Sequence, residues 1–205
     1  IVGIRAGICG PFSLAASLCP KEELLMGIMT DPEHVTNLLS KCCEVIQLYI
    51  DYLQGSCPGI VMFDSLIAPP LVRPEDYESI ILPHHRSLIA YARTKGFPHQ
   101  ILISGGDTRP ILNYLESTGA TQLLLDYTIS AQEASEVITS STTVYRYNLD
   151  PLKLMTFPKD EIKTYVQRVL NQLPNRKSFI LGTGILSADT PVENIAAVKE
   201  GLAAE

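Results

Sequence analysis

The stretch QILISGGDTRPILNYLESTGATQLLLD, residues Gln100–Asp126, contains a complete strand–helix–strand pattern. An apolar run over Gln100–Ser104 leads through two glycines to helical spacing over Arg109–Thr118, and a second apolar run follows at Gln122–Asp126. Short apolar runs joined by a helix are typical of parallel strands that helices cover. The stretch therefore predicts one βαβ unit.

The same alternation extends along the rest of the chain. Four further apolar runs have the length of strands: Val2–Cys9, Ile60–Asp64, Thr143–Tyr147 and Phe179–Gly182. Five further segments have helical spacing: Pro32–Leu53, Pro74–Lys95, Ala131–Ile138, Pro158–Leu173 and Pro191–Ala204. The longest of them begins after Asp31, a suitable N-cap residue. Six strands alternating with helices predict an α/β fold with a parallel sheet.

Two architectures have this pattern, an open doubly wound sheet and a (β/α)8 TIM barrel. The nucleotide-binding form of the open sheet carries an early glycine-rich turn, and neither G-x-G-x-x-G nor G-x-x-x-x-G-K-[ST] occurs. Six units in 205 residues occupy about 34 residues each, so eight units need roughly 270, close to a usual barrel. We expect a TIM barrel of which about six βα units are present, with residues 1–205 forming a single domain that lacks its N-terminal part.

Composition excludes several classes of protein. Sixteen basic and 22 acidic residues give a net charge of −6, which argues against binding to a nucleic-acid backbone. No apolar run approaches the ~20 residues of a membrane span. Five cysteines without a C-x-x-C motif match neither a disulfide framework nor a zinc knuckle, and indicate reduced thiols in the cytoplasm.

Polar residues gather where the predicted strands end, and in both architectures ligands bind at the carboxyl ends of strands. Asp64, Asp107 and Asp126 are the candidate catalytic residues, because a carboxylate there can act as a general acid or base. Aspartate also caps helices and forms turns, so a structural role is the alternative for each. No metal-ligand motif is present, and the adjacent His84 and His85 do not point to one metal from a helix.

Further candidates bind substrate rather than react with it. Gly106 and Thr108 belong to a loop ahead of a helix that can present backbone N–H groups to an anion. Asn148, Thr183 and Gly184 follow the last two predicted strands.

Several segments occur in an order that resembles one superfamily. They are Gly10-Pro11-Phe12-Ser13-Leu14-Ala15, Asp31-Pro32-Glu33, Phe63-Asp64-Ser65, Gly106-Asp107-Thr108-Arg109-Pro110-Ile111-Leu112, Asn148-Leu149-Asp150-Pro151 and Thr190-Pro191-x-Glu193-Asn194-Ile195. Together they resemble the uroporphyrinogen decarboxylase superfamily, which includes the cobamide:coenzyme M methyltransferases and related corrinoid enzymes. The resemblance spans the chain and implies a (β/α)8 barrel.

The segment around Gly106 is similar to the methyltransferase motif His-x-Cys-Gly-x-Thr. In that branch the His, the Cys and a later Cys bind a zinc ion that activates a thiol. Ile103, Gly105 and Thr183 stand at those positions here, so zinc is not expected. The resemblance implies a divergent corrinoid-dependent methyltransferase that moves a methyl group to or from a cobalamin protein. The expected partners are a small-molecule substrate and a corrinoid protein carrying methylcobalamin. No tightly bound cofactor is expected. Formation of a homodimer is an open alternative.

The decarboxylase branch is the first alternative. Ser65 matches a serine of that branch that contacts substrate and is therefore a further substrate-binding candidate. The Gly-His-Gly motif of the branch is Gly182-Thr183-Gly184 here, and Ser17 stands in place of a tyrosine. The six predicted loops supply one nearby arginine, Arg109, for a porphyrinogen with four carboxylates. The second alternative is a non-catalytic barrel used for binding or assembly. We expect an enzyme, either a methyltransferase or a lyase, and this alternative stays open beside it.

Overall fold

Six strands form one parallel sheet in which each strand pairs with the next one in the chain. A computed structural model describes residues 4–140, 142–173 and 178–203. The strands are β1 (Ala6–Cys9), β2 (Gly59–Phe63), β3 (His99–Ile103), β4 (Gln122–Leu125), β5 (Val144–Leu149) and β6 (Phe179–Thr183). The order β1-β2-β3-β4-β5-β6 has no crossover of the doubly wound kind. It confirms the prediction of a barrel-type α/β sheet.

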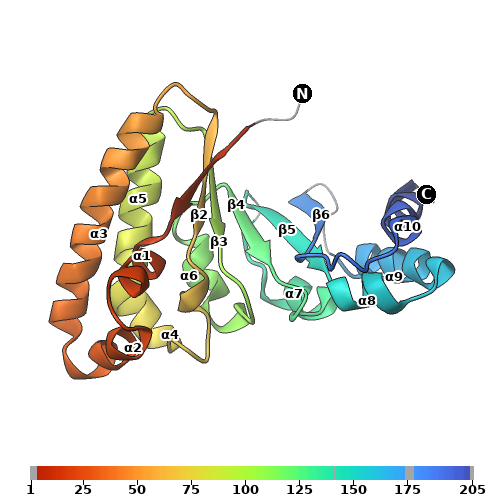
Figure 1. Cartoon of the computed structure of the whole chain (residues 1–205), viewed down its shortest axis with the longest axis horizontal. Coiled ribbons are helices and arrows are strands. Elements are labelled where there is room, and N and C mark those ends of the chain that lie inside the picture. The colour runs from red at the N-terminus through yellow and green to blue at the C-terminus, as the bar shows by residue number, and fades with distance from the viewer. Residues whose placement is uncertain (1–3, 141, 174–177, 204–205) are drawn as a thin grey trace.

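Helices follow each strand, as the alternation predicts. The α-helices are α1 (Pro11–Leu18), α2 (Lys21–Thr30), α3 (Pro32–Leu53), α4 (Pro74–Asp76), α5 (Leu82–Thr94), α6 (Leu112–Glu116), α7 (Ala131–Val137), α8 (Pro151–Thr156), α9 (Lys159–Gln172) and α10 (Val192–Ala203). Short turns η1 (Ser65–Ile67), η2 (Tyr77–Ile81) and η3 (Arg109–Ile111) complete the connections. Figure 1 shows α3 and α5 side by side at one end of the molecule and α8, α9 and α10 at the other. None of the described helices is long and apolar enough to cross a membrane.

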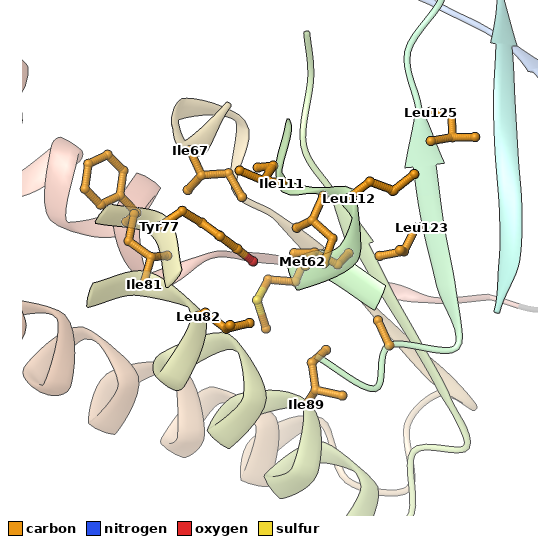
Figure 2. Packing of buried hydrophobic residues seen from close by; sticks show 14 of the residues in the cluster. Met62, Ile67, Tyr77, Ile81, Leu82, Ile89, Ile111, Leu112, Leu123 and Leu125 are labelled. Carbon is orange, nitrogen blue, oxygen red and sulfur yellow. The ribbon is translucent and has the colours of Figure 1, made fainter. Parts of the chain in front are cut away.

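The apolar core lies between the sheet and the helices. Met62 of β2 and Leu123 of β4 lie on the side of the sheet that α5 covers (Figure 2). Ile89 of α5 and Leu112 of α6 belong to the same apolar cluster. Each of these side chains is at most 1% exposed. Burial of an aliphatic side chain stabilises the fold by about 1.5–3 kcal/mol, so this cluster fixes how the helices sit on the sheet.

The strands differ in how fully they are buried. All four residues of β4 are buried, as expected for strands covered on both faces. That expectation is wrong for the two outer strands, where Gly7 and Cys9 of β1 are exposed and Ile180 of β6 is 44% exposed. Within the described residues, β1 and β6 each have a neighbour on one side only, so one edge of each strand is unpaired.

The predicted helix over Pro74–Lys95 contains a widened turn. It begins as α4, passes through the π-helical turn η2 and continues as α5. The Leu82 N–H bonds to the Tyr77 carbonyl, five residues back. Pro83 follows directly, and because proline has no N–H and crowds the preceding turn, a wider turn accommodates it in the helix.

Candidate functional site

The carboxyl ends of the strands surround a cavity of about 560 Å³. Because the strands are parallel, the residues that end them meet at one rim of the sheet. Five of the nine predicted site residues line this cavity: Ser65, Asp126, Asn148, Thr183 and Gly184. Apolar side chains from the neighbouring strands, including Phe63 of β2 and Ile103 of β3, form the rest of the wall. The cavity therefore combines a few polar groups with an apolar surface, as small-molecule sites do.

Arg146 of β5 is the cation of the cavity. Its Nε donates to Asn148 Oδ1 at 3.2 Å, and its Nη2 donates to the Thr183 carbonyl at 3.3 Å. A guanidinium has five N–H groups, so two bonds leave others free to meet a ligand. In the described part of the chain, no carboxylate lies within 4 Å of this guanidinium. Arg146 is thus positioned by neutral acceptors and keeps its charge available for an anion.

Gly182 of β6 makes room for that arginine. A Cβ atom at Gly182 would lie 2.5 Å from Arg146 Nε and 3.0 Å from Asn148 Oδ1, closer than real Cβ contacts. Asn148 and Gly182 are partners in the register between β5 and β6. The missing side chain therefore lets the guanidinium lie across β6.

Asp126 follows β4, which only β5 separates from β6 in the sheet, and it lines the same cavity. Its Oδ2 accepts a hydrogen bond of 3.1 Å from the Gly106 N–H. Gly106 has φ 77°, in the left-handed region that favours glycine. Asp126 Oδ1 is buried and has no partner among the described residues. A buried oxygen with no partner is costly, so a hydrogen-bond donor brought to this atom would stabilise it.

Asp107 and Thr108 lie outside the cavity lining. Arg109 Nε donates to Asp107 Oδ1 at 2.8 Å, and the Arg109 hydrogen bond lowers the pKa of the Asp107 carboxyl. Arg109 also pairs with Glu133. Thr108 is fully buried, and its Oγ1 has no partner among the described residues. The geometry gives Asp107 a structural ion pair, and its predicted catalytic role gains no support from its position.

Asp64 is fully buried and does not line the cavity. Its Oδ2 accepts from the Phe12 N–H at 3.1 Å, and its Oδ1 accepts from both the N–H and the hydroxyl of Ser13 at 2.7 Å. Gly10 allows this approach, since a Cβ there would lie 2.4 Å from Asp64 Cβ. Asp64 therefore binds the first turn of α1, which is the structural alternative for a strand-end aspartate.

A buried histidine completes the surroundings of Asp64. His85 Nε2 lies 2.9 Å from Asp64 Oδ2, and Tyr77 Oη lies 3.0 Å from His85 Nδ1. Burial, with a smaller contribution from the Asp64 charge, raises the pKa of Tyr77, so its hydroxyl stays protonated beside the ring. Tyr77 begins the widened turn η2 and His85 lies on α5, and the sequence pattern contains no signal for this network.

Cys9 and Cys43 are not activated as nucleophiles. Burial, followed by the charge of Asp64, raises the pKa of the exposed Cys9 at the end of β1. Burial is also the main cause that raises the pKa of Cys43 on α3 to about 12. Thiols with raised pKa values are protonated at neutral pH and poor nucleophiles.

The three positions that match zinc ligands in the methyltransferase branch do lie together. Ile103, Gly105 and Thr183 all line the cavity. None of them carries a sulfur or nitrogen ligand for zinc, and no group of three His, Cys, Asp or Glu side chains in the described residues could hold a metal ion. The residues present do not fit a zinc ion.

Comparison with known proteins identifies similar sequences. The sequence model of the family "Uroporphyrinogen decarboxylase (URO-D)" matches residues 2–202. The chain is 29% identical over 189 residues to the uroporphyrinogen decarboxylase of Myxococcus xanthus, covering 88% of this chain and 53% of that protein. It is 29% identical over 201 residues to the enzyme of the same name from Koribacter versatilis, covering 92% and 55%. The chain thus spans about half the length of these curated relatives.

A solved structure has the same fold. A methyltransferase from Methanosarcina mazei superposes with a TM-score of 0.81 at 21% identity, covering 98% of this chain and 58% of that one. At this identity the likeness shows the fold alone, and it supports the TIM-barrel-like arrangement of the six βα units.

Proposed function

Because the chain belongs to the uroporphyrinogen decarboxylase family, we propose that its cavity binds a small carboxylic acid and serves methyl transfer to or from a corrinoid protein. The observation that carries this proposal is the Arg146 guanidinium, which faces the cavity without a carboxylate partner in the described residues. A single cation on a largely apolar wall suits one carboxylate better than four.

Arg146 binds the substrate carboxylate through its free N–H groups, and Asn148 keeps the guanidinium in place. Ser65 adds a hydroxyl at the rim, while Phe63 and Ile103 exclude water. The corrinoid, held by its own protein, supplies or accepts the methyl group. Methylation of an O–H, N–H or S–H group releases a proton, and the carboxylate of Asp126, which lines the cavity, is the acceptor for it.

The zinc-dependent activation of a thiol does not belong to this proposal. Ile103, Gly105 and Thr183 offer no ligand, so substrate activation depends on Asp126 and on the groups around the cavity. We include in the proposal that no cofactor is tightly bound. A cytoplasmic location is also proposed, supported by cysteines that are all free.

Porphyrinogen decarboxylation is the second candidate, favoured by the names of the relatives that are 29% identical. In that reaction Arg146 binds a carboxylate of the substrate. A proton must replace the carbon dioxide that leaves, and Asp126 is then the acid that donates it.

The test offers both substrates to the purified protein. Methyl transfer from methylated acids to reduced cobalamin is followed by the absorption change of the cobalamin, and decarboxylation of uroporphyrinogen by chromatography of the oxidised porphyrins. We expect methyl transfer, reduced at least about tenfold by Arg146→Met because a charged hydrogen-bond pair is lost, and unchanged by the exposed control Lys199→Met. Decarboxylation alone supports the second candidate, and ligand binding without turnover supports a non-catalytic barrel.

A further inference from the structure

A second cavity, of about 270 Å³, lies among α7, α8 and α9. Tyr127 lines both this cavity and the one at the strand ends. Two cations face it, Lys153 from α8 and Arg168 from α9. Neither residue belongs to the cavity at the strand ends, so their charges need a separate explanation.

The two cations have no counter-ion within the described ranges. No carboxylate oxygen there lies within 4 Å of the Lys153 ammonium or the Arg168 guanidinium. The ammonium of Lys153 instead lies 4.9 Å from the ring centroid of Tyr165. Glu133 also lines the cavity, but its carboxylate pairs with Arg109 and accepts hydrogen bonds from Ser130. In a chain with a net charge of −6, two cations facing one cavity form a local positive site.

Neutral donors surround the same space. Tyr165 Oη accepts a 3.1 Å hydrogen bond from the Asp150 N–H, and no acceptor for its own proton is found among the described residues. Burial is the main cause that raises the pKa of Tyr165, so this proton is present at neutral pH. The hydroxyl of Thr128 and the amide of Gln172 also line the cavity and have no partner in the described part of the chain.

We propose that this cavity binds a phosphate group, held by Lys153 and Arg168 with Tyr165 as a neutral donor. A phosphate has several acceptor oxygens and two charges, which match two cations and a set of hydroxyl and amide donors better than one carboxylate does. The phosphate is either inorganic or part of a phosphomonoester. The proposal is independent of the reaction at the strand ends.

Isothermal titration of the purified protein with inorganic phosphate tests the site. We expect saturable binding that Lys153→Met and Arg168→Met each weaken at least about tenfold, while Lys153→Arg keeps it. Lys21→Met is the matched control, because Lys21 begins α2 at the other end of the molecule (Figure 1) and its loss changes the net charge equally. Melting curves without phosphate verify that each variant is folded.

A second arm titrates glycerol phosphate and acetate. Tighter binding of glycerol phosphate than of inorganic phosphate identifies a phosphomonoester as the ligand class, and the reverse order identifies the free ion. Three results overturn the proposal: no saturable binding of either phosphate compound, equal binding of acetate, or equal weakening by Lys21→Met. The proposal is also overturned if Arg146→Met loses phosphate binding while Lys153→Met keeps it, because the anion then binds at the strand ends.

Discussion

Arg146 depends on a residue that has no side chain. Its Nε lies 2.5 Å from the position that a Cβ of Gly182 would take, so the sequence Gly182-Thr183-Gly184 has a steric meaning here in addition to its place in the family motif. Arg146 lies on β5, and the space for its side chain is provided by Gly182 on the adjacent strand β6.

Gly182→Ala tests this dependence. The added methyl group would lie 2.5 Å from Arg146 Nε, so the guanidinium must shift and lose its bonds to Asn148 and Thr183. We expect carboxylate binding to weaken about tenfold, while the melting temperature changes little because β6 is an outer strand. Titration with a carboxylate substrate, compared with Arg146→Met, measures the effect. Unchanged affinity in Gly182→Ala would show that the arginine does not need this space.

The candidate residues could be predicted in part because strand ends are visible in the sequence. Asp126, Asn148, Thr183, Gly184 and Ser65 follow apolar runs, and the structure brings them to one cavity. The same rule selected other candidates that point elsewhere, Asp64 toward α1 and Asp107 toward Arg109, because position along a chain does not show where a side chain points. The strand-end rule does not select Arg146, because this residue lies within β5 and its bond to the Thr183 carbonyl of the next strand is non-local.

At the scale of elements, Asp64 joins β2 to α1. It accepts three hydrogen bonds from Phe12 and Ser13 and contacts the buried His85. Helix α1 has no side-chain cap of its own at Gly10. Asp64 therefore supplies from another element what an N-cap residue supplies locally.

Asp64→Ala should lower the free energy of unfolding by about 3–5 kcal/mol, because it leaves several buried donors without an acceptor. Asp150→Ala is the matched control, since Asp150 is also a strand-end aspartate but caps only α8, through a 2.9 Å bond to the Leu152 N–H. That variant should lose about 1 kcal/mol. Urea unfolding measures both values, and equal losses would contradict the anchoring role of Asp64.

Glu116, at the end of α6, joins that helix to the segment before β5. Its carboxylate accepts from Thr139, Ser140 and the Tyr145 hydroxyl. Burial alone would raise the pKa of Glu116, but these hydrogen bonds outweigh it and lower the pKa below 4.5.

A lowered pKa in the folded state makes stability depend on acid. The contribution of Glu116 is complete above about pH 4.5 and is lost as the pH falls through its lower folded pKa. We expect Glu116→Gln to be less stable at neutral pH and to lose less stability than the original protein as the pH is lowered to about 3. Urea unfolding across this range measures it, with the exposed Glu136→Gln on α7 as control. If the stability of Glu116→Gln fell with pH as steeply as that of the original protein, the acid dependence would not come from Glu116.

The longest helix was predicted in full, whereas several short helices were missed. The helix over Pro32–Leu53 has the predicted bounds, and Asp31 caps it through a 3.0 Å bond from the His34 N–H. Helices α1, α2 and α8 were not predicted, because six to ten residues contain too few turns for a clear apolar stripe. The widened turn η2 depends on Pro83 and on packing around Tyr77, which no periodicity indicates.

At the scale of the whole molecule, the described sheet has two outer strands, β1 and β6, each paired on one side. Unpaired strand edges favour association with another chain. We expect this 205-residue chain, purified alone, to form dimers or larger species as its concentration rises. Sedimentation velocity over a range of concentrations measures this, and a 22.5 kDa species at every concentration would contradict it.

The strand order also bears on how the molecule folds. Gln122 pairs with Val144, 22 residues later, whereas Ala6 must find Ile60, 54 residues away. Closing the longer loop costs about 0.8 kcal/mol more in chain entropy, and contacts between near neighbours form sooner. The nucleus of folding is therefore expected around β3, β4 and β5, with native structure spreading outward. Strand β1 is expected to pair with β2 late in folding, after the middle strands of the sheet have formed.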